Sequence, residues 1–582
     1  MTKKNTIFIV IDSLYYERTI KNDYHNATMP FLDKLRCEGI DFTNMYSEAP
    51  YTEAALVSLL CGVDTMKKGG YLLKLKGKET IMETFKNNGY ETFCNCVQPI
   101  VYPSHSYQGL TDEYYNICYN FESLWSYRLD FYSKKYKNNE LDEKNLKIVI
   151  LLLEDNLLFW RKFFKALKTK DKVVSFILPY IDLVGLDDNI KLLEGEYKKF
   201  KDDKLNYVKD LLSKGREHEL FKIKTYELSE KMSLDNMKKL YYRYKKIIRK
   251  MFFKNMKYNL LNNKLVLTPK SEKKGLLKAY FNAIYNRFLY QKIDYHDNVK
   301  KAAPSMDRTF KHFESWLLSR KSNKPYFAYI HLDDCHRGEM FYTYDTDDFE
   351  MLDEEFKSID DYLNKLPKNY RGSISYDVSL RYADNCLKKL YTFLEEKKML
   401  ENVTIAICAD HGSSYTFDPY RSNYVNNVHR ENYNMPFVIW NKDLVHQTNK
   451  YFHNTKDIPA TLLELNGIEI PQEYDGISTL GNNGRDYVII ENVNGGCPDY
   501  NLRDILLGIR NKRYLVVMNL NIHKSFDEGS IYAVYDLMVD KDELYNLKDT
   551  IDKNIISKEL SIIKKEFEIL QEDINMNNYL NE

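Results

Sequence analysis

The stretch VTIAICADHG, residues 403–412, begins with a largely apolar run and ends on Asp410, His411 and a glycine. A short apolar run rich in β-branched side chains predicts a buried β-strand. A carboxylate and an imidazole then leave the same strand end, where open α/β sheets place their ligands. The stretch TIFIVI, residues 6–11, predicts a second such strand and ends on Asp12. Two strand-end acids, far apart in the sequence, and one adjacent histidine predict a metal site.

The charge balance of the chain argues against a polyanionic partner. The 582 residues include 85 Lys+Arg and 84 Asp+Glu, for a net charge of +1. Such a balance gives no overall field that attracts nucleic acid, so no nucleic-acid partner is predicted. The nine cysteines are an odd number and are scattered, which excludes a regular disulfide framework. Cys94 and Cys96 are close enough to chelate a metal, but small buried side chains are the more usual role of such thiols.

The N-terminal residues lack the charged, apolar and small-residue regions of a secretory signal peptide. The longest apolar stretches, residues 148–153 and 173–186, fall short of the ~20 residues that span a bilayer, and Asp182 interrupts the second. We therefore expect a cytoplasmic protein without a transmembrane segment. Peripheral membrane contact and the oligomeric state stay open.

The pattern of apolar residues predicts an α/β fold with a helical insertion. Residues 1–118 and 301–483 alternate strands with amphipathic helices, which indicates a doubly wound, mostly parallel sheet with helices on both faces. Residues 119–300 are rich in Lys, Tyr, Leu and Asn and repeat at helical spacing, so we expect a large helical insertion. Its lysine runs are either solvated faces or a surface for an anionic substrate or membrane. Residues 484–582 predict a small C-terminal α+β subdomain with a charged tail.

Thr52 is the candidate nucleophile. It begins a short apolar helix over residues 52–60, which Gly62 closes. A hydroxyl at that position lies in the positive field of the helix N-terminus, which also stabilises an alkoxide. A threonine at a helix start is also an ordinary N-cap, so the helix alone leaves both interpretations open.

Nine segments, in a fixed order along the chain, resemble the sulfatase / alkaline phosphatase superfamily. They are DSL (12–14), MPFLDKL (29–35), GIDFTNMY (39–46), SLLCG (58–62), TIMETFKNNGY (80–90), DHG (410–412), DIPATLLELNG (457–467), DG (475–476) and ELYNLKD (543–549). The resemblance covers most of the sequence outside the insertion. It implies an alkaline phosphatase-like fold and a metal-dependent ester hydrolase or transferase.

Aligned on SLLCG, Thr52 takes the position of the family nucleophile. In true sulfatases that residue is a Cys or Ser converted to formylglycine, followed by a Pro and an Arg at positions filled here by Ala54 and Leu56. The Lys and His that typically contact sulfate fall at about Val97 and Pro99 and are absent. Because threonine cannot become formylglycine, the chain is more similar to the phosphodiesterase, phosphoglycerol-transferase and phosphoethanolamine-transferase branches, which use a Thr nucleophile.

The resemblance implies that one divalent metal is bound by Asp12, Thr52, Asp410 and His411. Sulfatases typically complete this site with oxygen ligands, often an Asn after the late Asp. An imidazole in that place suits Mn²⁺ or Zn²⁺ better than Ca²⁺ or Mg²⁺, which remain alternatives. A second metal is the less favoured alternative, since the family spacing of Asp and His is not matched. Its ligands would be Asp333, His336 and His429.

Three further histidines are assigned roles through the same resemblance. His336 follows a strand in the place of a family histidine that faces the substrate, so we predict that it is catalytic and either protonates the leaving oxygen or binds a phosphoryl oxygen. His331, nearer the strand, is predicted to bind substrate, with a buried structural histidine as the alternative. His429 precedes the strand after the late metal pair and is also predicted to bind substrate, with a loop histidine as the alternative.

We therefore predict a metal-dependent hydrolase or transferase that acts on phosphate esters through Thr52. The substrate is expected to be a small anionic molecule or a phosphoester on a glycan or lipid. One alternative is a sulfuric ester hydrolase with an unmodified nucleophile. The other is an inactive binding or scaffold protein that keeps the fold; the presence of Asp12, Asp410 and His411 together argues against it.

Overall fold

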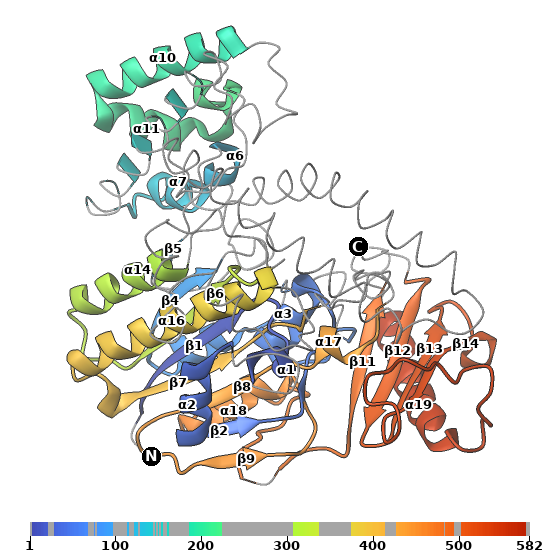
Figure 1. Ribbon diagram of the computed structural model, residues 1–582. Helices are drawn as coiled ribbons and strands as arrows, with labels where there is room; N and C mark the ends of the chain where they lie inside the picture. Colours follow the sequence, from blue (N-terminus) through green and yellow to red (C-terminus); the bar gives the residue numbers. More distant parts are fainter. Residues whose placement is uncertain are drawn as a thin grey trace. The chain divides into compact units, whose positions relative to one another are not determined.

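The computed structural model divides into two compact units (Figure 1). The first comprises Met1–Tyr114, Phe310–Gly338 and Arg371–Glu582, and the second Tyr115–Thr309 and Glu339–Tyr370. The structure describes residues 3–20, 28–67, 75, 78–96, 113–115, 121–125, 129–141, a scattered set between 143 and 164, 186–223, 306–336, 374–413, 427–481, 483–493 and 502–577.

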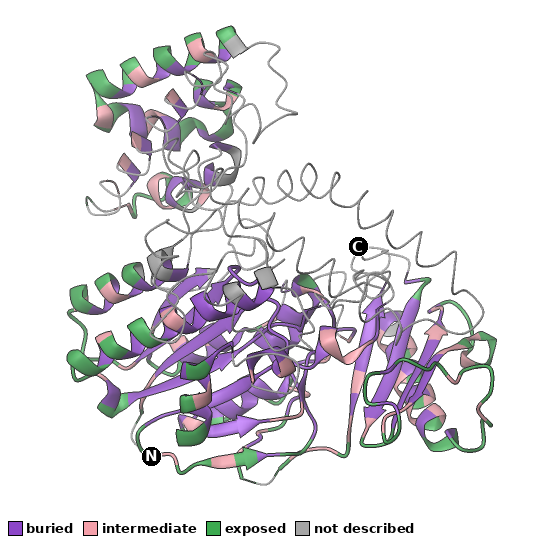
Figure 2. Cartoon of the chain, in the orientation of Figure 1, coloured by how far each residue is buried: buried purple, intermediate pink, exposed green. Residues whose placement is uncertain are grey.

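An eight-stranded sheet forms the centre of the first unit, in the order β5-β4-β6-β1-β7-β8-β2-β9. Its strands are β1 (Asn5–Ile11), β2 (Ile40–Phe42), β4 (Glu91–Cys96), β5 (Glu113–Tyr115), β6 (Tyr326–Leu332), β7 (Val403–Cys408), β8 (Phe437–Trp440) and β9 (Gln447–Asn449). β1 pairs in parallel with β6 and β7, whereas β8 is antiparallel to β7 and β2. β1, β6 and β7 are buried along nearly their whole length, as apolar runs covered on both faces must be (Figure 2).

The main helices of this unit are α2 (Pro30–Glu38), α3 (Thr52–Cys61), α5 (Ile81–Asn87), α14 (Met306–Ser319), α16 (Ile374–Glu396) and α18 (Asp457–Leu465). α2 packs on α16, and α18 packs on α3 and α5. Thr80 caps α5 reciprocally with Glu83, and the two residues form a capping box.

These helices cover both faces of the sheet. Phe327 of β6 and Phe93 of β4 point to opposite faces, because the register pairs Phe93 with the residue that follows Phe327. Phe85 of α5 stacks on Phe327 with ring centroids 4.2 Å apart. Phe313 of α14 packs against Phe93 on the other face, at 5.1 Å. The predicted doubly wound, mostly parallel sheet is therefore confirmed.

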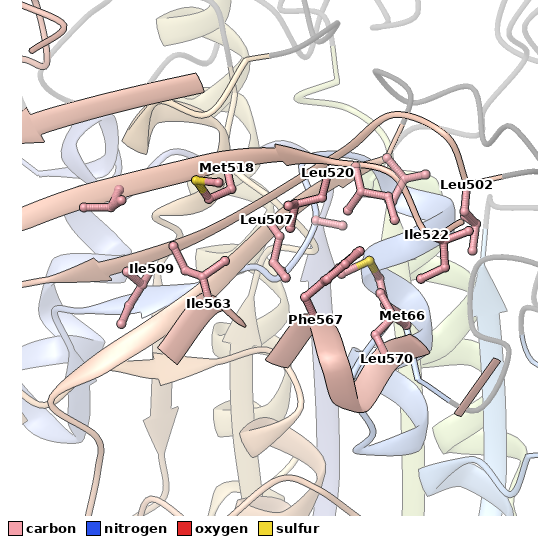
Figure 3. Close-up of a cluster of buried hydrophobic side chains, with 14 of the residues drawn as sticks. Met66, Leu502, Leu507, Ile509, Met518, Leu520, Ile522, Ile563, Phe567 and Leu570 are labelled. Atoms are coloured by element: carbon pink, nitrogen blue, oxygen red, sulfur yellow. The ribbon is translucent and has the colours of Figure 1, made fainter. Parts of the chain in front are cut away.

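A separate antiparallel sheet forms the C-terminal subdomain, as predicted. Its strands are β11 (Tyr487–Val493), β12 (Ile505–Asn511), β13 (Tyr514–Leu520) and β14 (Ser530–Asp536), in that order, and α19 (Ser557–Asn577) follows them. Figure 3 shows Leu507, Ile509 and Met518 packed with Phe567 of α19 on one face. The alternate residues, such as Leu506, pack on the opposite face in a cluster that includes Tyr46, Val428 and Tyr433. Both faces are thus buried, which ties the subdomain to the rest of the first unit.

The described part of the second unit is mostly helical. It includes α6 (Phe121–Leu124), α7 (Asp130–Lys137), α10 (Leu186–Asp202), α11 (Lys204–Lys214) and two short 3-10 turns, Gly215–Glu217 and Glu219–Lys222. Trp160, Phe200 and Leu211 belong to its own hydrophobic cluster. The predicted insertion falls within this unit, but its residues 224–300 lie outside the described residues.

None of the helices in the described ranges combines the length and the apolar character that a membrane crossing requires.

Candidate active site

Two acids meet at the end of two neighbouring strands. β1 and β7 are parallel, with Val10 paired to Cys408, so both strands end at the same edge of the sheet. Asp12 follows the first strand and Asp410 follows the second, and both side chains are fully buried. The structure thus brings together two acids that lie 398 residues apart in the sequence.

Thr52 lies beside these acids at the beginning of α3. Its Oγ1 is 3.2 Å from Asp12 Oδ2 and 3.3 Å from His411 Nε2. Thr52 is the first helical residue, and the N-cap is Tyr51, which makes no side-chain capping bond. The hydroxyl therefore faces the acids and the imidazole and does not cap its own helix.

His411 presents its Nε2 to the same cluster. This atom is 3.6 Å from Asp12 Oδ1 and 3.6 Å from Asp410 Oδ2. The Nδ1 lies 2.6 Å from the carbonyl oxygen of Gly412. A carbonyl oxygen can only accept, so Nδ1 carries the proton and Nε2 offers its lone pair to the cluster.

His331, which was predicted to bind substrate, also lies among these groups. It is on β6, is fully buried, and its Nε2 is 3.9 Å from Asp410 Oδ2. Its Nδ1 lies 3.1 Å from the hydroxyl of Tyr329. Ligand atoms of Asp12, Asp410 and His331 come within 4.8 Å of one another, so His331 belongs with the candidate metal ligands.

His336 lies in a second group that shares Asp12. The group comprises Asp12, Asp333 and His336, whose ligand atoms also come within 4.8 Å of one another. The Nδ1 of His336 is 3.9 Å from Asp333 Oδ1, and its side chain is partly exposed. A partly exposed imidazole next to a buried acid can reach a bound substrate and exchange protons with solvent.

His429 belongs to a third group, with Glu431 and Glu543. Its Nδ1 is 3.2 Å from Glu543 Oε2, and the same oxygen accepts the backbone N–H of Arg430 at 3.0 Å. Arg510 pairs with the other oxygen at 2.6 Å. Burial alone would raise the pKa of Glu543, but Arg510 and His429 outweigh it and lower that pKa to about 2.

The loop that carries His429 nevertheless contacts Gly412, which directly follows Asp410 and His411. Gly412 donates its backbone N–H to the carbonyl oxygen of Asn432 at 2.8 Å. A Cβ on Gly412 would lie 2.1 Å from the Glu431 carbonyl oxygen, so the close approach requires glycine. Glu543 reaches this loop from the C-terminal subdomain and was missed as a site residue. Its place in the ELYNLKD segment was the one signal in the sequence.

The two buried acids influence each other. Burial alone would raise the pKa of Asp12, but the charges of His336, His411 and His331 outweigh it and hold that pKa well below its usual range. Burial and the charge of Asp12 raise the pKa of Asp410. Burial also lowers the pKa of His331, which favours the neutral imidazole. Two fully buried carboxyl groups side by side gather negative charge that a bound cation can balance.

The atoms around this charge fit a divalent metal. Asp410 Oδ2 and His331 Nε2 are buried and have no hydrogen-bond partner in the described part of the chain. Such orphaned buried atoms are rare unless a water or an ion satisfies them. Carboxylate, imidazole and hydroxyl groups together suit Zn²⁺ or Mn²⁺. The residues available to hold it are Asp12, Thr52, Asp410, His411 and His331.

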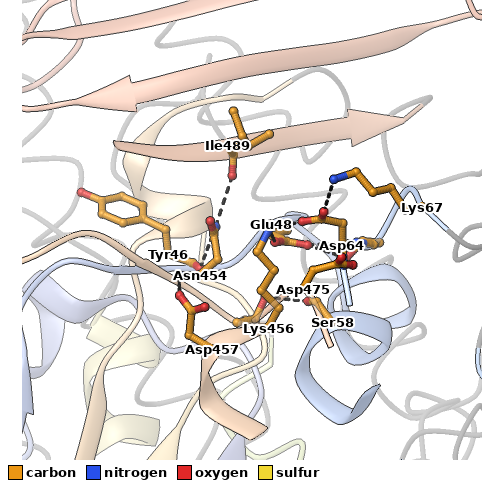
Figure 4. A network of polar contacts seen from close by, with 12 residues as sticks. Tyr46, Glu48, Ser58, Asp64, Lys67, Asn454, Lys456, Asp457, Asp475 and Ile489 are labelled. Atoms are coloured by element: carbon orange, nitrogen blue, oxygen red, sulfur yellow. Dashed lines mark hydrogen bonds and ion pairs between the residues drawn. The ribbon is translucent and has the colours of Figure 1, made fainter. Parts of the chain in front are cut away.

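A second polar network fixes both ends of α3 (Figure 4). Lys456 Nζ lies 3.0 Å from Glu48 Oε1, before the helix, and forms an ion pair with Asp64, after the helix. Glu48 Oε2 accepts the backbone N–H of Thr65 at 2.9 Å. The Lys456 side chain thus bridges the two segments that flank the helix of Thr52, and all three charged groups are largely buried.

We expect Lys456→Met to lower the free energy of unfolding by about 3 kcal/mol, since it leaves the buried Glu48 without its cation and Asp64 with Lys67 alone. Urea unfolding followed by circular dichroism measures the change. Lys442→Met is the matched control, because Lys442 pairs with Glu401 on the surface and such pairs contribute little. Equal midpoints for Lys456→Met and the wild type would contradict a stabilising role for the network.

Comparisons with known proteins agree with the fold. A sulfatase family model matches residues 4–157 and 251–468, more than half of the chain. A structure from Bacteroides thetaiotaomicron, reported with the metabolism of multiple glycosaminoglycans, has a TM-score of 0.51 at 12% identity and covers 99% of each chain. A 2-O GAG sulfatase has a TM-score of 0.50 at 12% identity, covering 99% of this chain and 94% of that one. Likeness at this identity shows the fold alone.

The phosphonate monoester hydrolase of Agrobacterium radiobacter has a TM-score of 0.48 at 12% identity, covering 97% of this chain and 96% of that one. No curated protein matches the sequence. The predicted resemblance to the sulfatase / alkaline phosphatase superfamily is confirmed by the extent of the family match: the chain belongs to the sulfatase family.

Proposed function

We propose that this sulfatase-family protein is a metal-dependent hydrolase or transferase that acts on phosphate esters through Thr52. The observation that carries the proposal is the position of Thr52 Oγ1, 3.2 Å from Asp12 Oδ2 and 3.3 Å from His411 Nε2. A hydroxyl among two buried acids and an imidazole is in the place of an activated nucleophile.

A divalent metal held by Asp12, Asp410, His411, Thr52 and His331 supplies Lewis-acid polarisation of a phosphoryl oxygen and lowers the pKa of the Thr52 hydroxyl. Asp12 Oδ2 accepts the hydrogen of that hydroxyl, which turns a lone pair of Oγ1 toward the substrate. The position of Thr52 at the start of α3 adds the positive field of the helix N-terminus.

In the first step, Thr52 Oγ1 forms a bond to phosphorus and its proton passes to Asp12 Oδ2, while the bond from phosphorus to the leaving oxygen breaks. His336 donates a proton to that oxygen. In the second step, water or an acceptor hydroxyl attacks the phosphorus of phospho-Thr52 and gives its proton to His336. The bond from phosphorus to Oγ1 then breaks, and Asp12 returns the proton that regenerates the Thr52 hydroxyl.

Sulfate esters are the second candidate substrates, because the matched family model is that of the sulfatases. Two features of the chain favour phosphate. Thr52 cannot be converted to formylglycine, and Ala54 and Leu56 stand at the positions where sulfatases carry Pro and Arg. The predicted substrate is a small anionic molecule or a phosphoester on a glycan or lipid.

Turnover of matched aryl esters tests the proposal. We expect purified protein loaded with Mn²⁺ or Zn²⁺ to hydrolyse 4-nitrophenyl phosphate or bis(4-nitrophenyl) phosphate faster than 4-nitrophenyl sulfate. Faster turnover of the sulfate would favour the unmodified sulfatase, and no turnover of any ester would favour a scaffold. An alcohol that captures the phosphoryl group in place of water identifies a transferase.

A further inference from the structure

Ser13, directly after Asp12, adopts a backbone conformation that residues with a side chain rarely adopt. Its φ is +65°, in the left-handed region. This region is unfavourable for any residue with a Cβ, and such strain persists only where surrounding contacts determine it. The strained residue stands at the end of β1, between the strand and the turn that leads to α1 (Tyr16–Thr19).

The conformation lets Ser13 hold both acids of the site. Its backbone N–H donates to Asp410 Oδ1 at 3.2 Å, and its hydroxyl donates to Asp12 Oδ1 at 2.7 Å. The other oxygen of each acid, Oδ2, faces the cluster. Asp12 Oδ2 is the atom next to Thr52, and Asp410 Oδ2 is the buried atom without a hydrogen-bond partner among the described residues. Ser13 therefore helps to set the rotation of both carboxyl groups, together with the backbone N–H of His411, which donates to Asp410 Oδ1 at 2.8 Å.

Tyr376 of α16 holds Ser13 in place. Its hydroxyl donates to the carbonyl oxygen of Ser13 at 2.6 Å and accepts the backbone N–H of Tyr15 at 3.0 Å. The Tyr376 side chain is almost fully buried, so water does not replace these bonds. A single hydroxyl thus bridges the two sides of the strained turn.

We propose that Ser13 and Tyr376 are positioning residues that orient Asp12 and Asp410 for metal binding, an inference that rests on the proposed function. Neither residue offers the metal a ligand; they act by hydrogen bonds on the groups that do. Outer hydrogen bonds of this kind typically change metal affinity by about 10–100-fold. An ordinary buried tyrosine that only stabilises the fold is the alternative.

Tyr376→Phe separates the two alternatives, because it removes only the hydroxyl. We expect its affinity for Mn²⁺, measured by isothermal titration calorimetry without substrate, to fall about 10-fold or more. Turnover should fall with it and recover as Mn²⁺ is raised. Tyr90→Phe is the matched control: it removes another buried tyrosine hydroxyl, bonded to Asn466 at 3.3 Å, and should bind Mn²⁺ like the wild type.

Ser13→Gly provides a second test if Tyr376→Phe does not fold. Glycine accepts the φ of +65° and keeps the N–H to Asp410 but loses the hydroxyl to Asp12. We expect weaker Mn²⁺ binding with an unchanged or higher melting temperature of the metal-free protein, an effect that a purely structural role does not produce. If the wild type binds Mn²⁺ and Tyr376→Phe or Ser13→Gly binds it equally well, the positioning role is wrong. If the wild type itself neither binds metal nor turns over any ester, the proposed function is wrong instead.

Discussion

Thr52→Ala is expected to reduce turnover of the best phosphate ester by about 10⁴-fold or more, the loss typical of a removed nucleophile. The substitution deletes the atom that forms the bond to phosphorus. Its hydroxyl contacts Asp12 and His411 and does not cap α3, so the helix keeps its start. Alanine is also the best helix former, and the melting temperature should therefore change little.

Thr52→Ser is the matched control for this variant. It keeps the hydroxyl and loses one methyl group, so most of the turnover should remain. A quenched reaction of the wild type, analysed by peptide mass spectrometry, should show a phosphorylated peptide containing Thr52, absent from Thr52→Ala. Full turnover in Thr52→Ala would exclude Thr52 as nucleophile and direct attention to a metal-activated water.

The parts of the site that lie at strand ends could be predicted from the sequence. β1 and β7 are short apolar runs, and each is followed by an aspartate that is unusual after a buried strand. Parallel strands in an α/β sheet bring such ends together, so the proximity of Asp12, Asp410 and His411 could be predicted without knowing how the side chains pack. Thr52 needed the resemblance as well, because a threonine at a helix start is ambiguous.

The supporting residues could not be predicted in this way. Tyr376 lies 363 residues from Ser13, on a helix whose amphipathic pattern predicts only that it packs on the sheet. The hydrogen bond from the Tyr376 hydroxyl to the Ser13 carbonyl oxygen depends on how α16 packs against the turn after β1. The sequence around Ser13 also does not predict a positive φ, since two of the contacts that hold this conformation come from the distant residues Asp410 and Tyr376.

His331 illustrates the same limit. The chemistry of an imidazole near a strand end is readable from the sequence, but its partner is not. β6 lies beside β1 in the sheet, on the side opposite β7, and this order places His331 within 3.9 Å of Asp410. Strand order is a property of the whole chain, so a residue that was predicted to bind substrate lies among the candidate metal ligands.

The C-terminal sheet presents the converse case. Apolar side chains occupy successive positions along its strands and so point to both faces of the sheet, a pattern that predicts burial on both sides. Only the structure shows what packs on each face: α19 on one, and segments near Tyr46 and Tyr433 on the other. On this second face, Glu543 of the subdomain contacts His429, in the loop that lies beside Gly412.

Asp410→Asn is expected to abolish Mn²⁺ binding and turnover while making the metal-free protein more stable. The amide keeps the Oδ1 that accepts the N–H groups of Ser13 and His411, so the turn should fold unchanged. It removes one of two fully buried carboxylates that face each other, and relief of such active-site strain typically raises the free energy of unfolding by about 1 kcal/mol. Calorimetry with Mn²⁺ and urea unfolding without metal measure the two effects.

The pH dependence of this gain follows from the pKa of Asp410, which burial and the charge of Asp12 raise. A carboxyl with a raised folded-state pKa contributes stability at a pH below its unfolded value of about 3.9 and loses it as the pH rises through the folded value. The stability gain of Asp410→Asn should therefore be absent in acid and present at neutral pH.

Asp457→Asn is the control of opposite sign, because Asp457 is equally buried but paired with Arg485. It should destabilise the protein and leave Mn²⁺ affinity unchanged. If Asp410→Asn bound Mn²⁺ as tightly as the wild type, Asp410 would not be a metal ligand, and the proposed activation of Thr52 by a metal at this site would be wrong.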